Sequence, residues 1–187
     1  MGRFLLGLIV GIALLVGGAL IYFISGMAPV AATAQPMPFE RLIAKTALHA
    51  TLRSDAPKTV PIQPTPANLL AGAQIYVHDC AFCHGTLQTE PSSEGRGMFP
   101  HAPQLFTRRG MVTDDPPGFT FWKVKNGIRL TGMPSFEKDL SDQQIWQVSM
   151  LLHEADKLPP SVSAALAPAP APAPAPAKTA PAPKHHR

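Results

Sequence analysis

The chain has 187 residues, including 22 prolines and 14 glycines, and its formal net charge is +4. Basic residues outnumber acidic residues by 5 to 2 in residues 1–65 and by 3 to 0 in residues 158–187, whereas residues 66–157 hold 8 basic and 10 acidic residues. Nucleic acid binding needs a concentrated basic face, so this distribution argues against it. The length suits one folded domain with extensions.

Residues 1–25 are expected to form a transmembrane anchor. Phe4–Ile24 contains no charged residue, and its length is about what a helix needs to cross a hydrocarbon core. A cleaved signal peptide is the alternative, because the sequence ATAQ at residues 32–35 offers a small-residue cleavage site. However, signal peptides have shorter apolar cores, and this site lies well beyond the apolar run. Arg3 precedes the anchor, so the positive-inside rule predicts a cytoplasmic N-terminus and an exported remainder.

Residues 26–65 are expected to form a connector that ends in a stiff, proline-rich spacer. Within it, residues 38–52 predict an amphipathic helix, and a free-standing helix of this length is marginal in water. Its apolar side should therefore rest on the following domain, on the membrane surface or on another subunit. The residues on or near that side are Phe39, Leu42, Ile43, Ala47 and Ala50.

A helix is predicted to begin at Thr65, a suitable N-cap, with Pro66 at its first position. Leu69, Ala73 and Tyr76 share one apolar face of this helix. Gly72 lies beside that face and would allow a second helix to approach closely.

The two cysteines of the chain stand together in Cys80-Ala81-Phe82-Cys83-His84. Four interpretations of this motif compete: a structural disulfide, a thioredoxin-like redox pair, half of a zinc site and a covalent haem attachment site. Thioredoxin-like chemistry needs an α/β domain, and zinc needs further ligands at short spacing; the sequence offers neither. Haem attachment needs only what is present. Two thiols on adjacent helical turns add to the haem vinyl groups, and His84 is then held beneath the iron.

Met133, in the sequence NGIRLTGMPSF (residues 126–136), is the candidate for the second axial ligand. It stands between a glycine and a proline, in a stretch that is not expected to be helical. A thioether there would approach the iron from the face opposite His84, and His/Met ligation raises the haem potential. The alternative is that Met133 fills a gap in the core. The competing ligands in the domain are Met98, Met111, His78 and His101.

A second major helix is predicted from the sequence LSDQQIWQVSMLLHEADKL (residues 140–158). Ser141 and Gln144 form a capping box, and the helix should cross the one that starts at Thr65. Its inward residues are expected to be Ile145, Trp146, Ser149 and Leu152.

Between the ligands, residues 119–128 predict a short helix, which carries Phe119, Phe121 and Trp122 toward either the porphyrin or the core. The nearby cations Lys123, Lys125 and Arg129 fit either a docking site for an acidic partner or a solvated face. Residues 159–187 are expected to be a disordered, Ala/Pro-rich tail in extended polyproline II conformation.

Residues 66–158 resemble a class I, single-haem cytochrome c domain of the bacterial type. The resemblance is carried by Gly72, Tyr76, the Cys80–His84 motif, the PHAPQL stretch, Met133-Pro134 and the LSDQQIW helix start. It implies an all-α fold around one covalent haem c, bound through Cys80 and Cys83, with His84 and Met133 as axial iron ligands. It also implies that Pro103 offers its carbonyl to the ring of His84, with Pro100 a weaker candidate.

With the anchor, the resemblance implies a non-enzymatic electron carrier of a respiratory or photosynthetic chain. We expect it in the bacterial inner membrane, with a periplasmic haem domain and redox partner proteins, in particular a membrane oxidoreductase complex. One alternative is a haem enzyme or small-ligand sensor in which Met133 is displaceable. The other is a mainly structural subunit of a membrane oxidoreductase complex.

Overall fold

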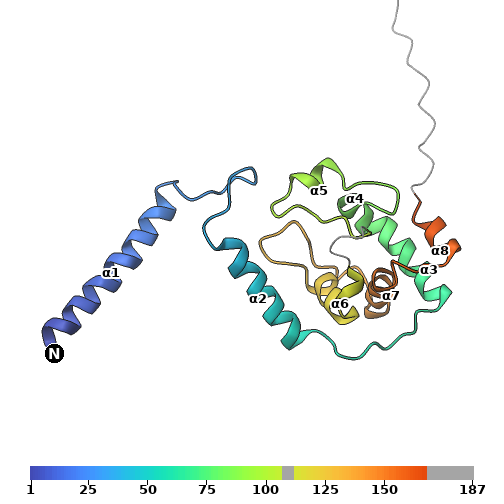
Figure 1. Ribbon diagram of the computed structural model, residues 1–187, viewed down its shortest axis with the longest axis horizontal. Coiled ribbons are helices and arrows are strands. Elements are labelled where there is room, and N and C mark those ends of the chain that lie inside the picture. Colours follow the sequence, from blue (N-terminus) through green and yellow to red (C-terminus); the bar gives the residue numbers. More distant parts are fainter. Residues whose placement is uncertain (107–111, 168–187) are drawn as a thin grey trace, which may run out of the picture.

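The computed structural model describes residues 1–106 and 112–167 (Figure 1). All regular elements in these two ranges are helical, which confirms the all-α class expected from the sequence. In chain order they are α1 (Gly2–Ile24), α2 (Glu40–Asp55), α3 (Pro66–Ile75), the π-helical turn η1 (Tyr76–Cys80), α4 (Ala81–His84), α5 (Ser93–Gly97), the 3-10 turn η2 (Val112–Asp114), α6 (Pro117–Asn126), α7 (Asp142–His153) and α8 (Pro160–Ala165).

The first helix of the compact region, α3, packs against α7, as the sequence predicts. Thr65 caps α3 by accepting the backbone N–H of Asn68, and Pro66 occupies the first turn. Gly72 is buried at the contact, where any Cβ would overlap the backbone carbonyl of Gln147 in α7. The absence of a side chain at position 72 therefore sets how closely the two helices approach.

The second helix of this pair, α7, starts with the predicted capping box of Ser141 and Gln144. All four residues expected on its inner side are buried. Helix α6 also packs against α7, and its Phe121 stacks on Trp146 of α7 with ring centroids 4.3 Å apart. The resulting core comprises Leu69, Ala73, Tyr76, Phe121, Val124, Ile145, Trp146, Val148, Met150, Leu151, Leu152, Val162 and Leu166.

The end of the folded region lies further along the chain than the sequence analysis expects. The tail was expected from residue 159, but Pro160–Ala165 forms α8, which packs against α3. Val162 and Leu166, four residues apart, are both fully buried. The expected boundary is wrong because these two core residues stand among alanines and prolines, and that composition indicates the start of the tail. The remainder of the tail, residues 168–187, lies outside the described residues.

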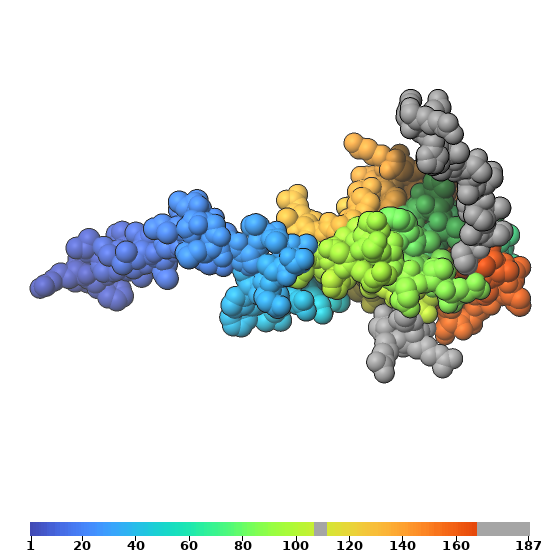
Figure 2. Space-filling view, turned by 90° about the horizontal axis from the view of Figure 1, so that it is seen from above, coloured from blue at the N-terminus to red at the C-terminus, as the bar shows by residue number. Residues whose placement is uncertain are grey.

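Helix α1 stands apart from the rest of the described chain, as Figure 2 also shows. None of its residues is buried, and its mean hydropathy is 2.8. At a rise of about 1.5 Å per residue, such a helix is long enough to cross a bilayer core. It therefore fits a membrane anchor.

The connector helix forms at Glu40–Asp55 rather than at 38–52, and it lies between α1 and the compact region (Figure 1). It meets that region at its C-terminal end, where Leu52 and Ala56 are buried. Next to them, the carbonyl of Pro57 rests on Gly118 at the start of α6 so closely that a Cβ there would overlap it. The apolar side expected to rest on something faces away from the domain, so the domain is not its support.

Candidate haem site

The Cys80–His84 motif lies where the first helix changes its winding. After α3, the π-helical turn Tyr76–Cys80 leads into α4, which ends at Gly85 with a positive φ of 71°. Both cysteines are free thiols and half-buried. They are three residues apart along these turns, so the two sulfur atoms stand about one helical turn apart. That is the spacing a pair of haem vinyl groups requires.

His84 is held by a hydrogen bond between its Nδ1 atom and the carbonyl oxygen of Pro103, at 2.7 Å. A carbonyl only accepts, so Nδ1 carries the proton and Nε2 keeps its lone pair. Burial lowers the pKa of His84, while the bond to Pro103 opposes that shift. The neutral, metal-binding form of the ring is therefore favoured. Pro103, expected to contact His84 by resemblance, lies in the position that this role requires.

The backbone that follows His84 is fixed by polar contacts that the sequence analysis did not identify. The buried hydroxyl of Tyr76 donates to the carbonyl of Gly85 at 2.8 Å. The side-chain amide of Gln104 donates to the carbonyls of Thr86 and Thr89, at 2.9 and 2.8 Å. Because Gln104 adjoins Pro103, one short segment both orients the histidine and holds the loop beneath it. The role of Gln104 could not be predicted from the sequence, because no local sequence pattern distinguishes this glutamine from others.

Cys80 is the more protected of the two thiols. Burial raises its pKa to about 12, and the neighbouring Asp79 and Cys83 raise it further. A thiol that remains protonated near neutral pH reacts slowly, since the thiolate is the nucleophile. Before haem attachment, Cys80 is therefore mostly in the less reactive thiol form.

Met133 lies in a tightly bonded loop between α6 and α7. Its N–H donates to the hydroxyl of Thr131 at 3.1 Å, and its carbonyl accepts the N–H of Ile128 at 3.2 Å. Gly127, at a φ of 68°, leaves room for the backbone of Met133 and Pro134, which a Cβ would displace. The Met133 side chain is half-buried and packs against the core. The loop therefore presents the thioether inward from a fixed backbone.

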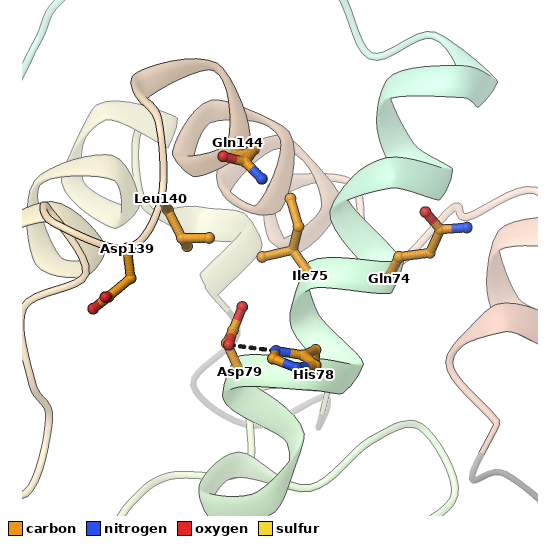
Figure 3. Close-up of a pocket in the computed structure, with 7 residues that line it drawn as sticks. All are labelled: Gln74, Ile75, His78, Asp79, Asp139, Leu140 and Gln144. Atoms are coloured by element: carbon orange, nitrogen blue, oxygen red, sulfur yellow. Dashed lines mark hydrogen bonds and ion pairs between the residues drawn. The ribbon is translucent and has the colours of Figure 1, made fainter.

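The rival ligands occupy other positions. The side chain of Met98 contacts Gly132, beside the Met133 loop, and His101 is exposed. His78 is exposed and its Nδ1 bonds to Asp79 at 2.6 Å. The pair lines a hollow of about 540 Å³ together with residues of α3, of the segment before α7 and of the start of α7. Figure 3 shows the side chains that line it and the bond between His78 and Asp79. Met111 lies outside the described residues.

The sequence analysis also made predictions about the short helix between the proposed ligands and about its lysines. The short helix forms as α6, and core packing against Trp146 accounts for Phe121. Lys123 pairs with Asp115 at 2.9 Å and Lys125 with Asp142 at 2.7 Å. Because both lysines are mostly buried and paired with carboxylates of this chain, they are poorly suited to docking an acidic partner.

The donor set fits haem c rather than a protein-bound metal ion. Within residues 1–106 and 112–167, no group of three or more His, Cys, Asp or Glu side chains could hold a metal. Instead there are two free thiols one helical turn apart, a histidine whose free Nε2 is fixed by its partner, and an inward methionine. One nitrogen and one thioether are too few for a closed protein site, but they would suffice for an iron whose other four ligands are porphyrin nitrogens.

Comparisons with known proteins agree with this donor set. Residues 67–150 match the family described as cytochrome c oxidase, cbb3-type, subunit III. The cytochrome c subunit of alcohol dehydrogenase (quinone) from Gluconobacter oxydans (strain 621H) is 30% identical over 105 residues, which are 51% of this chain and 20% of that protein. The chain thus spans about a fifth of the length of this relative. No solved structure matches the chain.

The compact region is therefore a single-haem cytochrome c domain with a class I fold, and its cofactor is covalently bound haem c. Such a domain serves electron transfer rather than catalysis of its own. The relative from Gluconobacter oxydans, named as a subunit of a dehydrogenase, is compatible with that role.

Proposed function

We propose that the chain is a membrane-anchored c-type cytochrome that transfers single electrons at the periplasmic face of a bacterial inner membrane. It acts as a subunit or tethered carrier of a membrane oxidoreductase complex in a respiratory or photosynthetic chain. The carrying observation is that one chain joins a 23-residue helix, with no buried residue and a single charged residue at Arg3, to a cytochrome c domain. Such a helix needs an apolar solvent, and the domain needs redox partners.

The chain divides by role into an anchor (1–25), a connector (26–65) and a haem domain from residue 66. Arg3 precedes the apolar run of the anchor, and by the positive-inside rule this supports a cytoplasmic N-terminus and a periplasmic haem domain. An oxidoreductase partner is supported by the relative from Gluconobacter oxydans, which is named as a subunit of such an enzyme.

In the proposed site, Cys80 and Cys83 hold the haem through thioether bonds, while His84 and Met133 bind the iron. When bound, the haem supplies a one-electron Fe(III)/Fe(II) couple. His84 contributes a neutral nitrogen whose orientation is set by Pro103. Met133 contributes a soft sulfur, which favours the reduced state and raises the potential. With both ligands in place, substrates have no open iron position.

The proposal is tested by solubilising native membranes in mild detergent and following the haem of this chain through size separation. Co-elution with an oxidoreductase assembly identifies a fixed subunit, and elution alone identifies a tethered carrier. Recovery of the full-length chain in the soluble periplasmic fraction contradicts the anchor. Carbon monoxide binding by the reduced wild-type protein, without displacement of Met133 by denaturant, contradicts the closed electron-transfer site.

A further inference from the structure

Helix α2 carries an apolar surface that packing within the chain does not explain. Phe39, Leu42 and Ile43 are 72%, 63% and 65% exposed, and the exposed Ala47 and Ala50 continue this outer face toward the C-terminal end of the helix. We propose that the outer face of α2 is seated in the headgroup and acyl boundary of the membrane. This inference rests on the anchor in the proposed function.

The outer face is distinct from the side that holds the haem domain. Leu48, Leu52 and Ala56 follow one another at intervals of four, which places them on one side of the helix. Leu52 and Ala56 are almost fully buried. Phe39, Ile43 and Ala47 also repeat every four residues, but about half a turn away from the first set. A single helix thus presents one apolar side to the domain and another outward.

The sequence around α2 favours lipid as the occupant of the outer face. From Phe4 to Phe39 the chain has no charged residue, so the segment from the anchor to the start of α2 carries no charge that would oppose its lying close to the membrane surface. The connecting segment also exposes Met27 and Val30. On the outer face, the large apolar residues stand at the end nearest the anchor, and the alanines stand at the far end. This gradient matches a helix whose anchor-proximal end lies deepest in the membrane.

The charges of α2 fit the same arrangement. Arg41 and Lys45 lie on the side opposite Ile43, and the Arg41 guanidinium stands 5.8 Å from the ring centroid of Phe99 in the haem domain. Interfacial helices have cations on the polar face and residues such as Phe and Leu on the other. Arg41 thus reaches toward the domain, whereas the long stem of Lys45 allows its ammonium group to extend toward lipid phosphates at the membrane surface.

The consequence is a haem domain held at a fixed height and orientation. The connector contacts the haem domain at two places. Pro57 lies against Gly118, and residues of the segment 29–36 line a hollow of about 340 Å³ with Phe99 and Leu130 of the domain. Leu130 belongs to the loop that carries Met133, so the connector lies beside the proposed axial-ligand loop. With α2 seated in the membrane surface, these two attachments prevent the domain from swinging freely on its anchor.

The test is a spin-label comparison of two neighbouring positions in the full-length holoprotein. The variants Ile43→Cys and Lys45→Cys each carry one nitroxide, since thioether-bonded Cys80 and Cys83 cannot react with the label. The protein is reconstituted into phosphatidylcholine vesicles with phosphatidylglycerol and kept reduced, so that low-spin ferrous haem does not relax the label. Collisions with oxygen, which concentrates in lipid, are compared with collisions with a water-soluble nickel chelate.

We expect the oxygen-to-nickel ratio at position 43 to exceed that at position 45 severalfold. Equal ratios would mean that the outer face is in water, and exclusion of both reagents at position 43 would mean that protein, such as a second copy, covers it. Either result overturns the inference. Vesicle flotation tests the anchor separately, so a chain that floats with a water-exposed position 43 refutes this inference alone. If a third cysteine disturbs haem attachment, a photoreactive phenylalanine analogue at each position replaces it, and lipid adducts are expected at position 43 only.

Discussion

His84 and Pro103 lie 19 residues apart in sequence, yet the carbonyl oxygen of Pro103 is 2.7 Å from Nδ1 of His84. The bond connects the end of α4 to a segment without regular structure. It fixes the ring tautomer and makes the other nitrogen a better donor, as outer partners of metal-binding histidines do. The fixed φ of proline holds the carbonyl in place.

Replacing Pro103 with glycine should loosen this bond. We expect faster exchange of the Nδ1 proton and a rise in midpoint potential on the order of tens of millivolts, because a less basic histidine stabilises Fe(III) less. Proton NMR of the reduced protein and redox titration measure the two effects. Pro100→Ala is the control, and a larger effect there than at Pro103 would reverse the assignment.

Replacing Met133 with alanine should lower the midpoint potential by roughly 0.1–0.2 V, a fraction of the roughly 0.8 V range that axial ligands span. The Fe–S charge-transfer absorption should disappear, and the reduced protein should bind carbon monoxide. Met98→Leu is the matched control, because Met98 contacts Gly132 in the same loop. If the absorption survives in Met133→Ala and is lost in Met98→Leu, Met98 is the ligand.

The parts of the fold that follow local rules could be predicted from the sequence. The caps at Thr65 and Ser141 and the inward face of α7 depend on neighbouring residues, and all are observed. The start of the tail and the orientation of α2 depend on which apolar residues pack against the domain and which do not. Val162 and Leu166 are buried although proline and alanine surround them, whereas Leu42 and Ile43 stay exposed in an amphipathic helix. Composition cannot make that distinction.

The candidate site divides in the same way. The cysteine motif and the Gly-Met-Pro context mark the proposed haem contacts because covalent attachment and ligation demand particular residue types. The supporting contacts of Tyr76 and Gln104 are common hydrogen bonds to carbonyls 9 and 18 residues away in the sequence. Only the folded backbone brings these groups together.

Gly72 should tolerate no side chain. In Gly72→Ala the new Cβ meets the backbone carbonyl of Gln147, which cannot rotate away, so α3 and α7 must separate. We expect a loss of about 1–3 kcal/mol in the free energy of unfolding, the usual cost of overpacking. Denaturant titration of the holoprotein, followed by Soret absorption, measures it.

Gly97→Ala provides the control for this experiment, because a Cβ at Gly97 meets no atom within 4 Å. Its φ is not in the left-handed region, so alanine should be neutral or stabilising by up to about 1 kcal/mol. Equal destabilisation by the two substitutions would show that the loss at position 72 does not come from the α3–α7 contact.

Tyr76 should make stability depend on alkaline pH. Burial raises the pKa of Tyr76, so the folded protein keeps the phenol protonated. In the unfolded chain the Tyr76 phenol ionises near pH 10, and above that pH its ionisation lowers the free energy of the unfolded state. The contribution of Tyr76 to the free energy of unfolding is therefore complete below about pH 10 and falls as the pH rises.

Tyr76→Phe isolates this contribution. It removes the hydrogen bond to the Gly85 carbonyl, so the variant should be less stable by about 1–2 kcal/mol at pH 7. At pH 11 the wild type loses about 1.4 kcal/mol through ionisation of the unfolded chain, and the variant does not. Urea titrations at pH 7, 9 and 11 should give the same difference at the first two values and a much smaller one at the third. A difference that stays constant to pH 11 would mean that the Tyr76 phenol ionises as readily in the folded protein as in the unfolded chain.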